Sequence, residues 1–207
     1  MAITDFRANL QHRFRQAGRS PMAEAVFRSV VASSTTLVGD IDSAGTASYH
    51  TLAPPDSRTM STLRRHSVTD YEHAARTVTK EDFRTFDYIL AMDGNNLRDL
   101  LRVRNSVLTT GKKGSSSHAA SSVSDYSARP IGSSGSGEKI AEVRLFGDFG
   151  PDGTIQSRVG GGEEVQDPYY GGAQGFEEVY EQAVRFSKAF LAYLATKGKA
   201  GGVVEES

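Results

Sequence analysis

The 207-residue chain contains no cysteine and no tryptophan. The absence of cysteine excludes disulfides, thiolate metal sites and thiol catalysis from this chain. No apolar run approaches the roughly 18 to 20 residues that span a membrane, and the first residues lack the apolar core of a secretory signal. The chain also lacks a large excess of positive or of negative charge, since its net charge is −1. We therefore expect a cytoplasmic protein that binds neither nucleic acid nor membranes.

The first 20 residues leave one targeting alternative open. They contain several arginines but a single acidic residue, Asp5. An arginine-rich, acid-poor start is also typical of mitochondrial transit peptides, so import into that organelle is the alternative to the cytoplasm.

Apolar residues make up 38% of the chain, which is below the average of globular proteins and indicates that part of it does not pack. Residues 110–138 are dominated by serine and glycine and show no apolar period. Such a segment buries too little surface to offset its ordering entropy, so we expect a disordered insertion there. Residues 196–207 are expected to form a flexible tail. One domain, residues 19–195, then remains, preceded by an atypical segment, residues 1–18.

Helical and strand patterns alternate along this domain. Capping residues and apolar spacing predict helices that begin near Ser20, Thr79, Asn95 and Phe176. Apolar stretches predict strands within TLVGDIDSAG (36–45), DYILAM (87–92) and KIAEVRLF (139–146). Strands that alternate with helices predict an α/β sandwich around a mostly parallel sheet, with a ligand site at the carboxyl ends of the strands.

The tripeptide Arg19-Ser20-Pro21 places a guanidinium beside the start of a predicted helix. Ser20 is a typical N-cap, and Pro21 suits the first helical position. Exposed N–H groups, the helix dipole and the arginine fork together suit a phosphate dianion. An ordinary capped helix with a solvated arginine fits these three residues equally well.

Longer motifs occur in the same order as in the low-molecular-weight protein tyrosine phosphatases, and the sequence resembles this family over residues 19–109 and 139–195. The motifs are RSPMAEAVFR, DSAGT, DSRT, TKEDFRTFDYILAMDGNNLRDL and VQDPYYGG, followed by FEEVYEQAVRFSKAFL. The resemblance implies a three-layer α/β sandwich around a four-stranded, mostly parallel sheet. It also implies hydrolysis of phosphotyrosine and aryl phosphates through a cysteinyl-phosphate intermediate, with no metal and no cofactor.

The resemblance places the nucleophilic cysteine six positions before Arg19, where this chain has Arg13. The preceding residues, MAITDFRANLQH, lack the apolar run of a central parallel strand, which leaves the first strand of the sheet doubtful. The pattern stops abruptly near Gly18, and we interpret this as an alternative first exon, a splice form or a mistaken gene model. Without a thiolate the chain is expected to be inactive or nearly so, a pseudoenzyme.

The resemblance also assigns roles to residues that the chain retains. Asp167 matches the general acid that protonates the leaving phenolate, and Arg19 matches the phosphate clamp. Ser20 would hydrogen-bond the thiolate if one were present. Asp93, at the end of the DYILAM strand, is expected to orient Arg19 by a charge-assisted pair.

Two further groups of residues complete the expected site. Tyr49, Tyr169 and Tyr170 match aromatic walls that would stack on a phosphotyrosine ring. Ser43 and His73 match a network that supports the phosphate loop. The expected partners are therefore phosphotyrosine-bearing proteins or small aryl phosphates.

Three alternatives remain at the level of sequence. A pseudophosphatase would use Arg19, Asp167 and the aromatic walls to bind phosphotyrosine without hydrolysing it. An aspartyl-phosphate hydrolase would use DIDSA (40–44), but Ala44 departs from the DxDx[TV] pattern and no downstream acidic pair for magnesium follows. Finally, a chain without its central strand would misfold, because the neighbouring strands would keep unpaired backbone groups.

Overall fold

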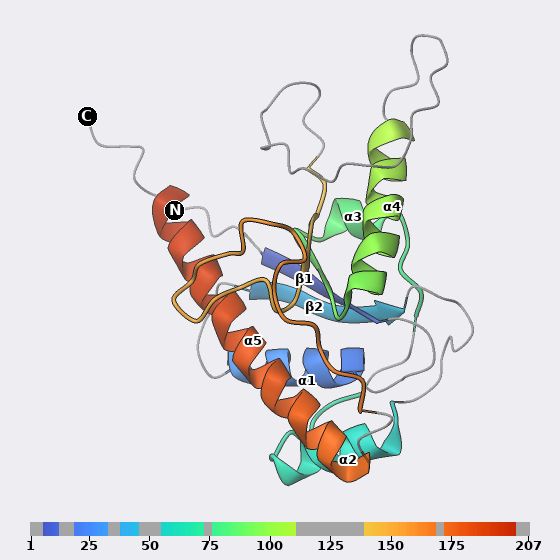
Figure 1. Ribbon diagram of the computed structural model, residues 1–207, viewed down its shortest axis with the longest axis vertical. Coiled ribbons are helices and arrows are strands. Elements are labelled where there is room, and N and C mark those ends of the chain that lie inside the picture. Colours follow the sequence, from blue (N-terminus) through green and yellow to red (C-terminus); the bar gives the residue numbers. More distant parts are fainter. Residues whose placement is uncertain are drawn as a thin grey trace.

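The computed structural model describes residues 6–12, 19–32, 38–45, 55–72, 76–110, 139–168 and 172–201. Its strands are β1 (Phe6–His12), β2 (Val38–Gly45), β3 (Tyr88–Ala91) and β4 (Glu142–Leu145). Its helices are α1 (Arg19–Ala32), α2 (Ser57–Arg65), α3 (Asp82–Thr85), α4 (Gly94–Thr110) and α5 (Gly172–Gly201). The elements form the three-layer α/β sandwich that the sequence predicts (Figure 1).

The four strands form one sheet in the order β2-β1-β3-β4, and every neighbouring pair is parallel. The predicted DYILAM strand is confirmed as β3, whose four residues are all buried. A strand that is covered on both faces suits such a continuous apolar run. The helical layers cover the two faces, so the carboxyl ends of the strands remain the edge at which a ligand site can form.

The doubt about the first strand is wrong, because β1 lies in the sheet between β2 and β3. In the register, Leu10 aligns with Ser43 of β2 and with Leu90 of β3. Ladder hydrogen bonds join backbone groups and do not require an apolar run. The expectation also overlooked that Phe6, Ala8 and Leu10 alternate with polar residues, which is the period of a strand.

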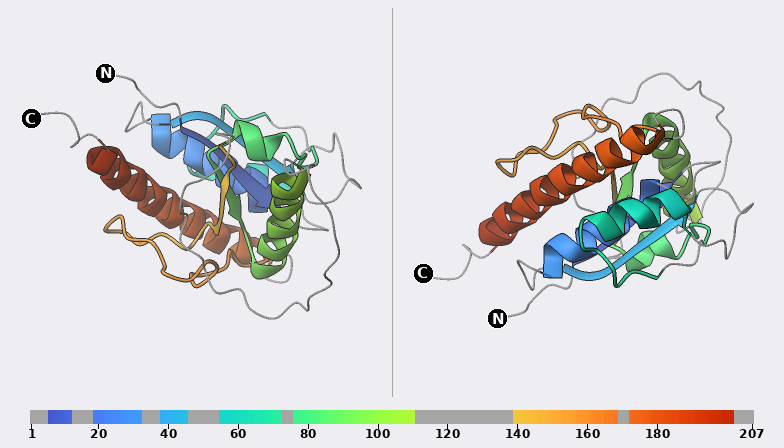
Figure 2. Two further views of the ribbon diagram at one scale, coloured as in Figure 1. Left: turned by 90° about the horizontal axis from the view of Figure 1, so that it is seen from above. Right: turned by 90° about the horizontal axis from the view of Figure 1, so that it is seen from below.

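Two hydrophobic cores lie on opposite faces of the sheet. On one face α1 and α5 pack against the sheet and against each other, with α2 at their end (Figure 2). In this core the rings of Phe27 and Phe190 lie 5.7 Å apart, and those of Phe149 and Phe190 lie 4.7 Å apart. On the other face α3 and α4 contribute Phe83 and Leu100, which are fully buried. Packing in these two cores holds the first turns of the helices in place relative to the ends of the strands.

The structure has a helix near each predicted start, and α4 and α5 begin at Gly94 and Gly172, against predicted starts near Asn95 and Phe176. α1 begins at Arg19, one residue before the expected cap. The predicted cap at Thr79 is wrong, because α3 has only four residues and its N-cap is Glu81. Thr79 and Asp82 still bind each other, since the Asp82 carboxylate accepts the Thr79 N–H at 2.7 Å. α5 runs to Gly201, so residues 196–201 of the expected flexible tail are helical.

The Ser/Gly-rich insertion lies almost wholly outside the described residues, apart from Thr110 at the end of α4. The insertion and the domain limits therefore stay predictions. Within the described ranges, none of the helices combines the length and the apolar character that crossing a bilayer requires.

Candidate functional site

Arg19 is the first residue of α1, and its side chain is buried beside the end of β3, with 6% of the residue exposed. Its Nη2 donates to Asp93 Oδ2 at 2.9 Å, and its Nη1 donates to the carbonyl oxygen of Val165 at 2.9 Å. The third nitrogen, Nε, is buried without a hydrogen-bond partner in the described part of the chain. Two protein contacts thus fix the guanidinium through Nη1 and Nη2, while the Nε–H is not used by either contact.

Asp93 lies between β3 and α4 and uses both carboxylate oxygens. Oδ2 pairs with Arg19, and Oδ1 accepts the backbone N–H of Asn96 at 2.8 Å. The second bond satisfies an N–H of the first turn of α4, so Asp93 also caps this helix. The Arg19–Asp93 pair predicted from the sequence is therefore present, and the capping bond explains why the carboxylate holds its place.

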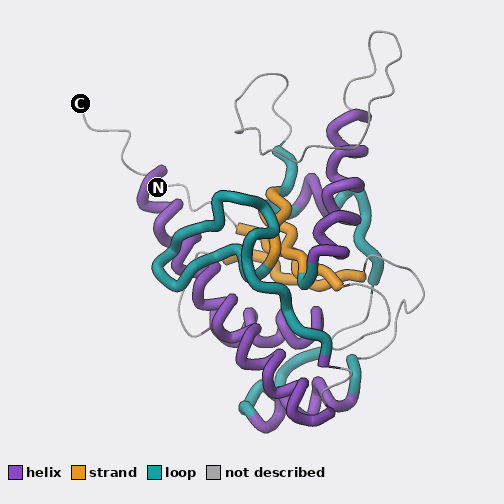
Figure 3. The backbone as a smooth tube through the Cα atoms, in the orientation of Figure 1, coloured by secondary structure: helices purple, strands orange, loops and turns teal. Residues whose placement is uncertain are grey.

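A loop from β4 to α5 runs back along α5 and then returns to the strand ends (Figure 3). Near its end, the Val165 N–H donates to the Met92 carbonyl at 2.7 Å, directly after β3. The next N–H, that of Gln166, donates to Gln182 Oε1 of α5 at 3.0 Å. Because Arg19 binds the Val165 carbonyl, the guanidinium is tied to the loop two residues before Asp167.

The start of α5 closes against this loop. A Cβ atom on Gly175 would lie 3.0 Å from the carbonyl oxygen of Pro168, so only a residue without a side chain fits without a shift. Asp167 precedes Pro168, and its side chain is exposed. Arg19, Asp93 and Asp167 therefore belong to connected segments at one edge of the sheet. Whether Asp167 acts as a general acid stays a prediction.

Glu163 anchors the same loop to α5 and gives a pH-dependent test of that attachment. Hydrogen bonds from Arg185 hold the pKa of Glu163 below its usual value, against the effect of burial. A lowered folded-state pKa contributes stability above the unfolded pKa, about 4.3, and that contribution disappears as the pH falls through the folded value. Glu163→Gln should therefore cost up to about 1 kcal/mol at pH 7 and much less at pH 3.

Urea denaturation at both pH values would measure this difference. Arg185→Gln is the matched control, because it removes the other partner of the same ion pair. The double variant should lose no more unfolding free energy than either single variant does. An equal cost of Glu163→Gln at pH 7 and pH 3 would contradict the assignment.

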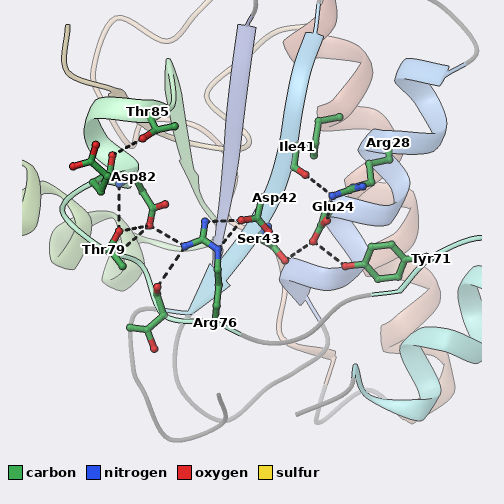
Figure 4. A network of polar contacts seen from close by, with 12 residues as sticks. Glu24, Arg28, Ile41, Asp42, Ser43, Tyr71, Arg76, Thr79, Asp82 and Thr85 are labelled. Atoms are coloured by element: carbon green, nitrogen blue, oxygen red, sulfur yellow. Dashed lines mark hydrogen bonds and ion pairs between the residues drawn. The ribbon is translucent and has the colours of Figure 1, made fainter. Parts of the chain in front are cut away.

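A buried network surrounds Glu24, which is 1% exposed (Figure 4). Its carboxylate accepts from Ser43 Oγ at 2.7 Å and from the Tyr71 hydroxyl at 2.9 Å, and it pairs with Arg28 at 2.7 Å. Burial, together with the Glu24 carboxylate, raises the pKa of Tyr71 far above its usual value, so Tyr71 remains a donor. Ser43 thus belongs to a polar network, while its expected companion His73 lies outside the described residues.

The sequence reasoning missed Glu24 as the centre of this network and missed Tyr71 entirely. One signal was present, because Glu24 stands alone within the apolar run PMAEAVF and so falls on a helix that is buried nearly all round. A carboxylate in such a position requires donors. Arg28 could have been named, because it follows Glu24 at i,i+4 on the predicted helix, but the sequence offered no sign of Tyr71 as a donor.

A second network joins the end of β2 to α3 through Arg76 (Figure 4). Arg76 binds Asp42 at 2.6 Å and Asp82 at 2.9 Å. Burial alone would lower the pKa of Arg76, but the two carboxylates outweigh it and raise the pKa. Asp42 is one of the two carboxylates that an aspartyl-phosphate hydrolase would need. Its pairing with Arg76 argues against that alternative.

The remaining predicted site residues divide into two groups. Ser20 is buried at the second position of α1 and is therefore not the N-cap that the sequence predicts, while its role in the site stays a prediction. The others lie outside the described residues, and their roles stay predictions: Arg13, Tyr49, His73, Tyr169 and Tyr170.

Comparisons with known proteins agree on one family. The family model "Low molecular weight phosphotyrosine protein phosphatase" matches residues 15–117. The human protein of that name is 38% identical over 174 residues, which are 84% of this chain and 86% of the relative. The protein of that name from Schizosaccharomyces pombe is 37% identical over 179 residues, or 86% of this chain and 90% of the relative.

Solved structures give the same result for the fold. A protein tyrosine phosphatase from Entamoeba histolytica has a TM-score of 0.63 at 25% identity, and the match covers 94% of this chain and 99% of that one. Primo-1 has a TM-score of 0.60 at 28% identity, with 90% of this chain and 96% of that one covered.

Proposed function

Because the chain belongs to the low-molecular-weight phosphotyrosine protein phosphatase family, we propose that it binds phosphate monoesters at Arg19 without hydrolysing them. The observation that carries this proposal is the state of Arg19 in a chain without cysteine. Its guanidinium is buried at the start of α1, is held by Asp93 and Val165, and keeps its Nε–H unused. A fixed guanidinium beside the first N–H groups of a helix suits a phosphate dianion.

Hydrolysis in this family requires an atom that attacks phosphorus. The expected position of the thiolate is occupied by Arg13, and none of the 207 residues is a cysteine. A guanidinium stays protonated in proteins and has no lone pair to offer as a nucleophile. Arg19 and Asp167 would still supply a clamp and a proton donor, but these groups assist a displacement and cannot begin one.

The relatives are phosphotyrosine phosphatases by name, so phosphotyrosine is the first ligand to consider. Tyr49, Tyr169 and Tyr170 would line a cleft for its ring, which favours phosphotyrosine-bearing proteins or small aryl phosphates over alkyl phosphates. Ser43 and His73 would support the site from behind. The protein is proposed to act in the cytoplasm, without a metal or a cofactor.

Calorimetry tests the binding half of this proposal. Titration of the chain with phosphotyrosine should give saturable heat at millimolar ligand or below. Arg19→Lys should weaken binding by about tenfold or more, because a lysine keeps the charge but cannot make the two fixed contacts of the fork. Arg64→Lys, a change at an exposed arginine of α2, is the matched control and should bind as the wild type does. The absence of heat at millimolar phosphotyrosine would contradict the proposal.

A further inference from the structure

Asn96 is a buried polar residue whose side chain makes no hydrogen bond to any residue that the structure describes. The residue is 0% exposed, and neither Nδ2 nor Oδ1 has a partner among the described residues. In the part of the chain that the structure describes, only two other buried side-chain atoms share this state, Arg19 Nε and Ser187 Oγ. Most buried polar side-chain atoms in folded proteins do find a partner, so an exception indicates either a fault in packing or a function.

Asn96 and Arg19, which both carry unpaired side-chain atoms, are linked through Asp93. One oxygen of the Asp93 carboxylate binds the Arg19 guanidinium at 2.9 Å, and the other binds the Asn96 backbone N–H at 2.8 Å. Two residues held by the same carboxylate thus both carry buried polar atoms without partners. This coincidence points to one site rather than to two separate packing faults.

The position of Asn96 on α4 agrees with this view. Leu100, four residues later, and Val107, eleven residues later, lie on the same stripe of the helix and are buried in the core against the sheet. Asn96 is the first residue of this stripe, at the end of α4 that meets the carboxyl ends of the strands (Figure 1). An apolar residue would suit the stripe better unless a polar group is needed at that end.

We infer that Asn96 is a further residue of the anion site, and that its carboxamide is reserved for hydrogen bonds that form only when a phosphate monoester is bound. This inference rests on the proposed function. Nδ2 and Arg19 Nε are both donors, and a phosphate dianion offers only acceptors, so the two groups are complementary to the ligand. Oδ1 then accepts from a water molecule held with the anion. The unpaired polar atoms lower the stability of the free protein, and their hydrogen bonds to the ligand restore it in the complex, as is common at functional sites.

The test separates stability from binding with two variants of the full chain. Asn96→Leu replaces an unpaired polar side chain by an apolar one that is also branched at Cγ, and Ser187→Ala removes the unpaired hydroxyl from α5. Ser187 is fully buried and lies roughly 20 Å along α5 from its start, so it is a matched control. Asn96→Ala is the second Asn96 variant, and it gives a result even if leucine is too large for the site and destabilises the protein. Inorganic phosphate and phenyl phosphate are the probes, measured by thermal melts and calorimetry.

Both Ser187→Ala and at least one Asn96 variant should melt about 2–4 °C above the wild type without ligand. With ligand they should diverge: Ser187→Ala keeps the wild-type affinity, whereas the Asn96 variants lose about tenfold for both probes. In nitrogen-15 NMR spectra of the wild type, the side-chain amide signals of Asn96, identified by their loss in Asn96→Leu, should shift as phosphate is added.

Wild-type affinity in both Asn96 variants would overturn the inference while leaving the proposed function intact. If the wild type itself bound neither probe, the proposed function would fail and the role of Asn96 with it. Equal losses in Ser187→Ala and in the Asn96 variants would also overturn the inference, because they would show a general effect of unpaired buried groups.

Discussion

The purified chain is expected to release p-nitrophenol from p-nitrophenyl phosphate no faster than buffer does. The resemblance implies a reaction that begins with attack of a thiolate on phosphorus, and it places that thiolate at Arg13 in a chain without cysteine. The proposed clamp Arg19 and the predicted acid Asp167 cannot replace the attacking atom. Absorbance of released p-nitrophenolate over hours, against a buffer blank, would measure the rate.

Two variants of the chain show whether the loss of activity comes from the missing nucleophile alone. A graft of a family-like strand and cysteine loop in front of Ser20 should restore turnover, because the retained clamp would then have its nucleophile. Arg13→Cys alone should fail, because Arg15 and Gln16 occupy places where the family has the glycine and asparagine that wrap N–H groups around the phosphate. Steady turnover by the unmodified chain, with a phosphoenzyme that accumulates during the reaction, would contradict the expectation.

The sequence predicts most of the fold because most elements carry a local signal. β3 is a continuous apolar run, Ser20-Pro21 lies in the first turn of α1, and the bond between Thr79 and Asp82 involves only neighbours in the chain. β1 carries only a weak local signal, the alternation of Phe6, Ala8 and Leu10 with polar residues. Its place between β2 and β3 comes from backbone hydrogen bonds to strands that are distant in sequence, and these bonds are the same for polar and apolar residues.

The candidate site is only partly predictable for the same reason. The Arg19–Asp93 pair could be predicted because both residues stand at element ends that meet at one edge of a parallel sheet. The bond between Glu24 and Tyr71 could not, since Tyr71 lies 47 residues away and no pattern links the two. Gln182 likewise appears as one more polar residue of a long helix, and only the structure reveals its bond to the Gln166 N–H. Such contacts depend on tertiary placement.

Asp93→Ala should have the largest effect on stability among substitutions at the site. It leaves the Arg19 guanidinium buried without its counter-charge and removes the cap of α4. Removal of one partner of a buried ion pair costs about 3–5 kcal/mol, and loss of a helix cap costs about 1 kcal/mol. Urea denaturation of the wild type and of the variant would measure the loss, and calorimetry should show that phosphotyrosine binding is lost as well.

Two further variants separate the roles of Asp93. Asp93→Asn keeps an oxygen that can accept the Asn96 N–H but removes the charge, so it should retain the cap while Arg19 still lacks its counter-ion. In the double variant Arg19→Met/Asp93→Ala the uncompensated charge is gone, and part of the lost stability should return although binding does not. Asp93→Ala with wild-type stability and affinity would show that Val165 alone orients Arg19. A double variant less stable than Asp93→Ala would show that the cost comes from packing around Arg19 and not from its charge.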